Sequence, residues 1–314
     1  MALTINTNIS SLIAQRNLND ATNALNLSIE RMTTGFKINH AADNAAGYSI
    51  SNMWVTQLGS LDVASDNAAT GADMLTTAEE TYSLLSSHLQ RVRDLTEQAA
   101  NGTYGSQSLK AIKAEIEARL QEVNRIAANA EFNGINLMDG KGVSASGINL
   151  QVGLYSDANS CINLAQSLFA DASISGLFTG ALTYVQAVNN TAASINGSLE
   201  DFAAACAGLK KGANGYEIGG EDVKAVDMLT LIDNAINEIS DRTTKIGAAQ
   251  NRISSAIEAL DVQSQNLTSS LSTLRDTDIA KESSNYIQAQ ILQQASATLL
   301  STANQLPSIA LNLV

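Results

Sequence analysis

Aromatic residues, proline and cysteine are all scarce in this sequence. Aromatics make up 4% of the 314 residues, Pro307 is the one proline, and there are two cysteines. Wide ligand pockets draw on aromatic side chains, so this composition suits an enzyme with such a pocket poorly. A core of Leu, Ile and Ala instead favours helices packed into bundles or coiled coils. The length allows two ordinary domains or one long rod.

The sequence also lacks clustered positive charge and long apolar runs. Its formal net charge is −13 and it has no basic run, so we expect neither a nucleic-acid partner nor attachment to an anionic membrane. No stretch approaches the ~20 apolar residues of a membrane span. The opening MALTINTNIS has no basic region followed by a long apolar one. We therefore expect either a cytosolic protein or one exported without a cleaved signal peptide.

Sites for metals or catalysis are not indicated. Cys161 and Cys206 form no CxxC pair, and His40 and His88 lie far from both in the sequence. Two packed or exposed thiols are the preferred interpretation, and a Cys161–Cys206 disulfide is the alternative for a protein that works outside the cell. The motifs HExxH, GxSxG, Walker A and GxGxxG are absent. We predict no catalytic, cofactor or metal site, and hence no enzyme.

The most regular feature is a seven-residue repeat of large aliphatic residues between positions 232 and 274. Such a repeat predicts a long helix, here over 223–275, whose apolar seam needs a helical partner. Arg242 stands at one of the alternate seam positions, which are otherwise small or polar. We expect its stem to pack and its head to lie in water, with Glu79 or Glu80 as alternative partners. The large seam residues are Ile232, Ile239, Ile246, Ile253, Leu260, Leu267 and Leu274.

Apolar stripes at helical spacing predict further helices, over residues 1–34, 44–98, 106–130 and, near the C-terminus, to about Gln305. We expect Ser106 to cap the third helix and Pro307 to kink or end the last one. The two terminal helices carry their own seams for assembly, made of Leu18, Leu25, Met32, Leu292, Leu299 and Leu306.

The middle of the chain is less regular. Asn133-Gly134 predicts a hairpin turn, and the alternation of Ile148, Leu150 and Val152 predicts one strand. Periodicity then weakens, with short helices expected near 184–193 and 198–209. We interpret 180–221 as a small, variable outer insertion that is exposed and tolerant of change.

The fold class predicted is mainly α: an elongated coiled-coil or helical-bundle rod formed by pairing N- and C-terminal segments, with a β-hairpin and a small variable insertion. We expect a terminal coiled-coil domain from 1–43 and 276–314, and a rod domain from 44–179 and 222–275. Burial in the thin terminal pair hardly offsets an ordering cost of ~1–2 kcal/mol per residue. We therefore expect the ends to order only when many copies pack together.

Several segments resemble bacterial flagellin. They include MALTINTNISSLIAQRNL, GFKINHAADNAAGYSIS, LQRVRDLTEQAANGT, IGAAQNRISSAI and AQILQQASATLLSTANQLP, and with the other matching segments they cover roughly 1–153 and 226–312 in family order. The resemblance implies an extracellular subunit that self-assembles into the flagellar filament for swimming, after unfolded export through the flagellar secretion channel. It implies as partners other copies of the chain, the cap and hook–filament junction proteins, an export chaperone, and the host Toll-like receptor for flagellin. A hook–filament junction protein, a surface adhesin and a filament-borne enzyme are the alternatives.

The receptor site implied by the resemblance lies on two consecutive helices. Arg91, Leu95 and Gln98 fall on one face of the first, where a Leu flanked by charged residues would serve as a binding anchor. Contacts between subunits are the alternative role for the whole set. The matching positions are Gln90, Arg91, Leu95, Gln98, Glu115 and Arg119.

Overall fold

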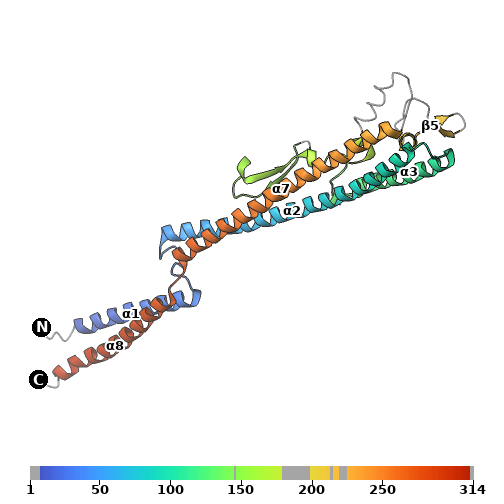
Figure 1. The fold of residues 1–314 in the computed structure, drawn as a ribbon. Helices are drawn as coiled ribbons and strands as arrows, with labels where there is room; N and C mark the ends of the chain where they lie inside the picture. Colours follow the sequence, from blue (N-terminus) through green and yellow to red (C-terminus); the bar gives the residue numbers. More distant parts are fainter. Residues whose placement is uncertain (1–7, 145, 179–198, 213–214, 219–224, 312–314) are drawn as a thin grey trace. The chain divides into compact units, whose positions relative to one another are not determined.

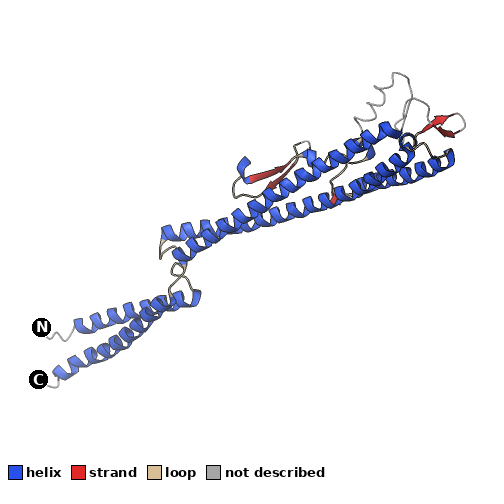
Figure 2. Cartoon of the chain, viewed as in Figure 1, coloured by secondary structure: helices blue, strands red, loops and turns tan. Residues whose placement is uncertain are grey.

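The computed structural model describes residues 8–144, 146–178, 199–212, 215–218 and 225–311. This described part is mainly helical and adds three short two-stranded antiparallel sheets (Figures 1 and 2). The chain divides into two compact units. Unit 1 comprises residues 1–60 and 263–314, and unit 2 comprises residues 61–262. The predicted mainly helical class, with N- and C-terminal segments paired and small hairpins added, is confirmed.

Five long helices make up most of the described chain. Helices α1 (Ile9–Thr34) and α8 (Ile279–Leu311) belong to unit 1, and α3 (Ser106–Asn129) belongs to unit 2. Helices α2 (Ala45–Ala100) and α7 (Ala225–Arg275) each contribute residues to both units. The spacing of apolar residues thus located every long helix.

Short polar residues and glycine set the helix ends. Asn8 caps α1, because its Oδ1 accepts a hydrogen bond from Ser11 N at 3.1 Å. Gly35 ends the same helix with a φ of +75°, a conformation that glycine adopts without strain. Asp278 starts α8 by accepting from Ala280 N at 2.9 Å. Ser106, predicted as a cap, is instead the first residue of α3.

Helix α8 does not end at its proline. It includes Pro307 and continues to Leu311, so of the two predicted outcomes the ending is wrong. A proline inside a helix has no N–H to donate to the carbonyl four residues earlier. That carbonyl, on Ala303, accepts a hydrogen bond from Asn8 Nδ2 at 2.7 Å. The missing helical hydrogen bond is therefore replaced from another helix.

Helices α2 and α7 run antiparallel in unit 2, as Figure 1 shows. Arg93 Nε donates to Asp233 Oδ1 at 2.6 Å, and Gln250 Nε2 donates to Glu79 Oε2 at 2.9 Å. Alongside these polar links the predicted stripes of α2 and α7 meet in one core, which also includes the stripe of α3. Its side chains exposed by 1% or less include Leu75, Tyr82, Leu85, Leu89, Ile116, Leu120, Ile232, Ile239, Ile246 and Ile253.

The Asn133-Gly134 hairpin is confirmed. Strands β1 (Glu131–Phe132) and β2 (Ile135–Asn136) pair antiparallel across it. Asn133 and Gly134 have φ values of 50° and 78°, the left-handed backbone that this tight turn requires. The sequence signal was sufficient here because both turn residues tolerate positive φ.

A second hairpin packs on α2. The predicted strand is β3 (Ile148–Gln151), and it pairs with β4 (Cys161–Leu164), which the sequence analysis missed. The Leu150 side chain lies against Gly71 of α2 so closely that a methyl group at position 71 would overlap it. Asn67 Nδ2 also donates to Gln151 O at 3.2 Å. Glycine inside α2 therefore marks the place where the hairpin docks.

The segment expected to be an exposed insertion is partly buried. After the short elements η1 (Ala158–Ser160), η2 (Gln166–Leu168) and α4 (Ile174–Leu177), the described chain resumes with α6 (Leu199–Cys206), β5 (Leu209–Gly212) and β6 (Gly215–Ile218). Residues 202–207 are each exposed by 3% or less, which contradicts the expectation for them. The reason is that α6 packs on α3 and the Phe202 ring lies 4.6 Å from that of Phe178. The helix expected at 184–193 lies outside the described residues.

Candidate assembly surface on the terminal helix pair

Helices α1 and α8 pack antiparallel through small residues. On α1 the buried side chains are Ala14, Ala21 and Ser28, which are seven residues apart. On α8 the buried positions also repeat every seven residues, at Glu282, Ala289, Ser296 and Ala303. A seven-residue repeat keeps one face of a helix against its partner, and small side chains on that face let the two backbones approach closely.

Larger side chains flank this narrow seam and are only partly covered. Leu18, Leu25 and Met32, the predicted seam residues of α1, are half-buried. Tyr286, Gln293 and Leu300 occupy the corresponding places on α8. Leu18, Leu25 and Met32 therefore do lie beside the partner helix, but apart from Glu282 the buried positions are held by alanine and serine.

The predicted seam of α8 is wrong for this helix pair. Leu292 and Leu299 are 50% and 62% exposed, and Ala295 is exposed as well. The face of α8 that packs against α1 contains Ala289 and Ser296, because small side chains allow the two helix backbones to approach more closely. Ala303 is buried, whereas the side chain of Leu306 lies outside the described residues.

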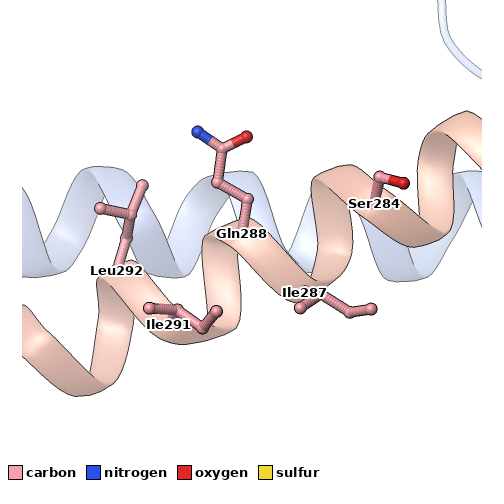
Figure 3. A pocket seen from close by; sticks show the side chains of 5 residues that line it. All are labelled: Ser284, Ile287, Gln288, Ile291 and Leu292. Atoms are coloured by element: carbon pink, nitrogen blue, oxygen red, sulfur yellow. The ribbon is translucent and has the colours of Figure 1, made fainter.

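Large aliphatic side chains consequently remain on the outer surface of unit 1. On α8, an open groove is lined by Ser284, Ile287, Gln288, Ile291 and Leu292, and Figure 3 shows these side chains standing out from that one helix. Positions opposite a coiled-coil seam normally carry polar residues, and apolar patches on a surface mark interaction sites. On α1 and α8, the described aliphatic side chains exposed by more than a third are Ile9, Leu12, Ile13, Leu27, Ile29, Ile279, Ile287, Ile291, Leu292 and Leu299. We call this set the outer aliphatic face.

Backbone contacts close one end of the α1–α8 pair. Phe36 and Asp276 form an antiparallel bridge, and Thr277 N donates to Gly35 O at 2.8 Å. The Arg275 guanidinium lies over the Phe36 ring at 4.1 Å. Lys37 Nζ donates to Thr273 O at 2.7 Å. These contacts join the segment that follows α1 to the segment that precedes α8.

Burial along the α7 seam falls toward the C-terminal end of that helix. Ile232, Ile239, Ile246 and Ile253 are exposed by 1% or less, and Leu260 by 6%. Leu267 and Leu274 are only half-buried. The members of the seven-residue repeat that belong to unit 2 are thus all buried, whereas the last two, Leu267 and Leu274, keep part of their apolar surface exposed.

Arg242 is buried, contrary to the expectation that its head lies in water. The residue is 5% exposed, and its Nε donates to Glu238 Oε1 at 3.0 Å on the same helix. Its Nη1 donates to the carbonyls of Ala170 and Asp171 at 2.9 and 3.2 Å. Neither of the partners proposed on α2 is used, because the chain around residue 170 covers the guanidinium.

A tyrosine completes this attachment of the 168–171 segment. Tyr82 OH donates to Leu168 O at 2.9 Å, and the Arg242 guanidinium lies 6.0 Å from the Tyr82 ring centroid. Burial raises the pKa of the Tyr82 phenol, so it stays protonated and keeps donating. Arg242 and Tyr82 thus pin one irregular segment to both α7 and α2.

The structure brings together some of the predicted receptor residues. Arg91 Nε and Nη2 donate to Glu115 Oε1 at 3.0 and 2.9 Å, which joins α2 to α3 at the surface. Gln98 Nε2 donates to Tyr104 OH at 2.8 Å. Leu95, however, is 2% exposed and belongs to the core, so it does not form an exposed anchor.

The remaining two predicted receptor residues, Gln90 and Arg119, take no part in the ion pair between Arg91 and Glu115. Gln90 is exposed and lines an open groove of about 420 Å³ between α2 and α7, together with serines of α2. Arg119 is half-buried on α3. The groove lining also includes Tyr82 and Thr243. The resemblance placed these residues on two consecutive helices, but it could not separate the buried members of the set from the exposed ones.

Both cysteines are free thiols, which confirms the preferred interpretation over a disulfide. Cys161 Sγ donates to Gln151 Oε1 at 2.9 Å. Cys206 is fully buried in α6, and burial raises the pKa of its thiol to about 12. Within the described residues, no group of three or more His, Cys, Asp or Glu side chains is arranged to hold a metal ion. Over the same residues, no helix is apolar for long enough to cross a membrane.

Comparisons with known proteins agree with this architecture. Residues 5–142 match the bacterial flagellin N-terminal helical region, and residues 229–314 match the bacterial flagellin C-terminal helical region. Flagellin B of Vibrio cholerae and polar flagellin F of Vibrio parahaemolyticus are each 33% identical over 380 aligned residues, and flagellin B of Vibrio anguillarum is 32% identical. Each alignment covers 100% of both chains. The chain therefore belongs to the bacterial flagellins, the structural proteins that build the extracellular flagellar filament.

Proposed function

We propose that copies of this filament protein pack against one another through the outer aliphatic face of α1 and α8. The proposal rests on an unusual distribution of side chains in this pair. Small residues occupy most of the seam between the two helices, while the large side chains of Ile291 and Leu299 are 60% and 62% exposed. Exposed aliphatic side chains of this size each represent about 1.5–3 kcal/mol of unrealised burial. Burial between copies would supply the stabilisation that a thin isolated pair lacks.

Replacing one of these residues with serine tests the proposal. Leu299→Ser should raise the protein concentration needed for assembly by about tenfold or more, because it removes about 1.5–3 kcal/mol of apolar burial per contact. Tyr155→Ser is the matched control, since Tyr155 is 64% exposed but lies outside the terminal pair. Assembly is followed by sedimentation and electron microscopy after salt is added. Equal critical concentrations for Leu299→Ser and the parent would contradict the proposal.

We also propose that the ends order only on assembly. Hydrogen exchange on the dilute monomer should then show fast exchange in α1 and α8 and slow exchange in the α2–α7 core. The assembled filament should protect all four helices. Strong protection of residues 9–30 in the monomer would refute this.

Export in an unfolded state, with the help of a chaperone, is the third proposal. It draws on membership of the flagellin family and on the two free thiols, since a chain without a disulfide can be fully extended. A tightly folding domain fused to the N-terminus should block secretion into the medium, and a destabilised version of the same domain should restore it. Equal secretion of both fusions would exclude unfolded export.

Recognition by the host Toll-like receptor for flagellin is proposed for the surface around Arg91 and Glu115. Both side chains are partly exposed and held together, which presents one charged feature bridging two helices. Arg91→Ala should lower signalling potency in a receptor reporter cell. Arg125→Ala is the matched control, because Arg125 forms an exposed ion pair with Glu122 on α3 outside the proposed set. Equal potency of Arg91→Ala and the parent would remove the receptor proposal.

A further inference from the structure

A seam of small residues repeated every seven positions does not define its own register. Ala14 and Ala21 of α1 would meet residues of similar size if α8 slid by two turns, because Ala289, Ser296 and Ala303 are also seven apart. Coiled coils resolve such ambiguity with specific polar contacts, at some cost in stability. The bridge between Phe36 and Asp276 is such a contact at one end of the α1–α8 pair, and the question is what specifies the register at the other end.

The single proline of the chain leaves a hydrogen-bond acceptor without its helical donor before the last turn of α8. Because Pro307 has no N–H, the carbonyl of Ala303 has no helical donor, although the helix continues to Leu311. Ala303 is 7% exposed, so water is largely excluded from it. A buried carbonyl without a partner costs about 1–3 kcal/mol.

Asn8 supplies the missing donor from α1. Its Nδ2 donates to Ala303 O at 2.7 Å, and its Oδ1 accepts from Ser11 N at 3.1 Å as the cap of α1. An amide side chain can do both at once, since it carries a donor group and an acceptor group. An aspartate would keep the cap but would place a second oxygen against the carbonyl.

We propose that Asn8 and Pro307 form a register lock between the terminal helices, with Asn8 as a positioning residue for filament assembly. The lock works only when the start of α1 lies beside the one turn of α8 that the proline leaves open. Ser11 Oγ donates to Asn304 Oδ1 at 2.7 Å in the same place. The bridge between Phe36 and Asp276 fixes the opposite end, and the lock acts at the end where no backbone hydrogen bond joins the described residues of α1 and α8.

A double-mutant cycle on assembled filaments tests the lock. Asn8→Asp keeps the capping oxygen and removes the donor, and should speed hydrogen exchange in residues 9–14 by about tenfold. Pro307→Ala restores an N–H that reaches Ala303 O, so each Asn8 substitution should have a smaller effect in that background, and the uncharged Asn8→Ser should change exchange there by less than about twofold. Asn8→Ser, which is uncharged and keeps a capping oxygen, should behave as Asn8→Asp does. It serves as the second variant if Asn8→Asp does not assemble.

Two results would overturn the lock. One is an equally large effect of the Asn8 substitutions with and without Pro307→Ala, which would reduce Asn8 to an ordinary helix cap. The other is unchanged exchange in both Asn8 variants. The inference rests on the α1–α8 pair within the proposed assembly. Failure of the Leu299→Ser test would refute the outer aliphatic face, whereas absence of coupling between Asn8 and Pro307 in intact filaments would refute only the lock.

Discussion

The buried guanidinium of Arg242 leads to a quantitative prediction about unit 2. Arg242→Ala removes two hydrogen bonds to the carbonyls of Ala170 and Asp171 and one to Glu238. Hydrogen bonds from a charged donor are worth about 1.5–3 kcal/mol each, and relief of the buried charge offsets part of that sum. We expect the free energy of unfolding to fall by about 3 kcal/mol.

Urea unfolding followed by circular dichroism measures this loss. With a slope of about 2–3 kcal/mol per molar urea, the midpoint should fall by about 1 M. Arg242→Met keeps the packed stem and loses only the hydrogen bonds, so we expect a loss of about 1–2 kcal/mol. Lys245→Ala, at an exposed position one turn away, is the control and should stay within about 0.5 kcal/mol of the parent.

Hydrogen exchange locates the same effect. The segment around residues 168–172 should lose protection in Arg242→Ala before the helices do, because its carbonyls lose their anchor. Should Arg242→Ala unfold at the same urea concentration as Lys245→Ala, the buried hydrogen bonds would contribute nothing. The interpretation of Arg242 as the attachment point of this segment would then be refuted.

Two further predictions concern α6 and the thiols. Phe202→Ala should destabilise unit 2 by about 3–5 kcal/mol in the same assay, because the buried ring that contacts Phe178 is lost. A loss of stability below about 1 kcal/mol would instead support the prediction that this segment is an insertion tolerant of change. At pH 8 a maleimide should label Cys161 in the native protein and both thiols after unfolding, since burial raises the pKa of Cys206 to about 12. The folded state holds this proton more tightly than the unfolded state, so its stabilising contribution is complete below about pH 9 and declines as the pH rises toward 12. Rapid labelling of Cys206 in the native protein would contradict this.

Sequence periodicity determined the long helices, because repeated apolar spacing depends only on local helical geometry. The apolar repeat from Ile232 to Leu260 predicted a packing partner, and in unit 2 these residues are buried. Asn133-Gly134 determined its hairpin for a similar reason, since the turn conformation belongs to those two residues themselves. The family motifs are also local strings, which is why the resemblance to flagellin could be identified without coordinates.

Only the tertiary structure decided which face of each terminal helix points inward. Two seven-residue patterns coexist on α8, one aliphatic through Leu292 and Leu299 and one small through Ala289 and Ser296, and hydrophobicity alone favours the wrong one. Close backbone approach selects the small pattern, which no single helix can reveal. Burial of Arg242 and Leu95 likewise depends on chain segments distant in the sequence, and so does the hydrogen bond from Asn8 to the carbonyl that Pro307 leaves open.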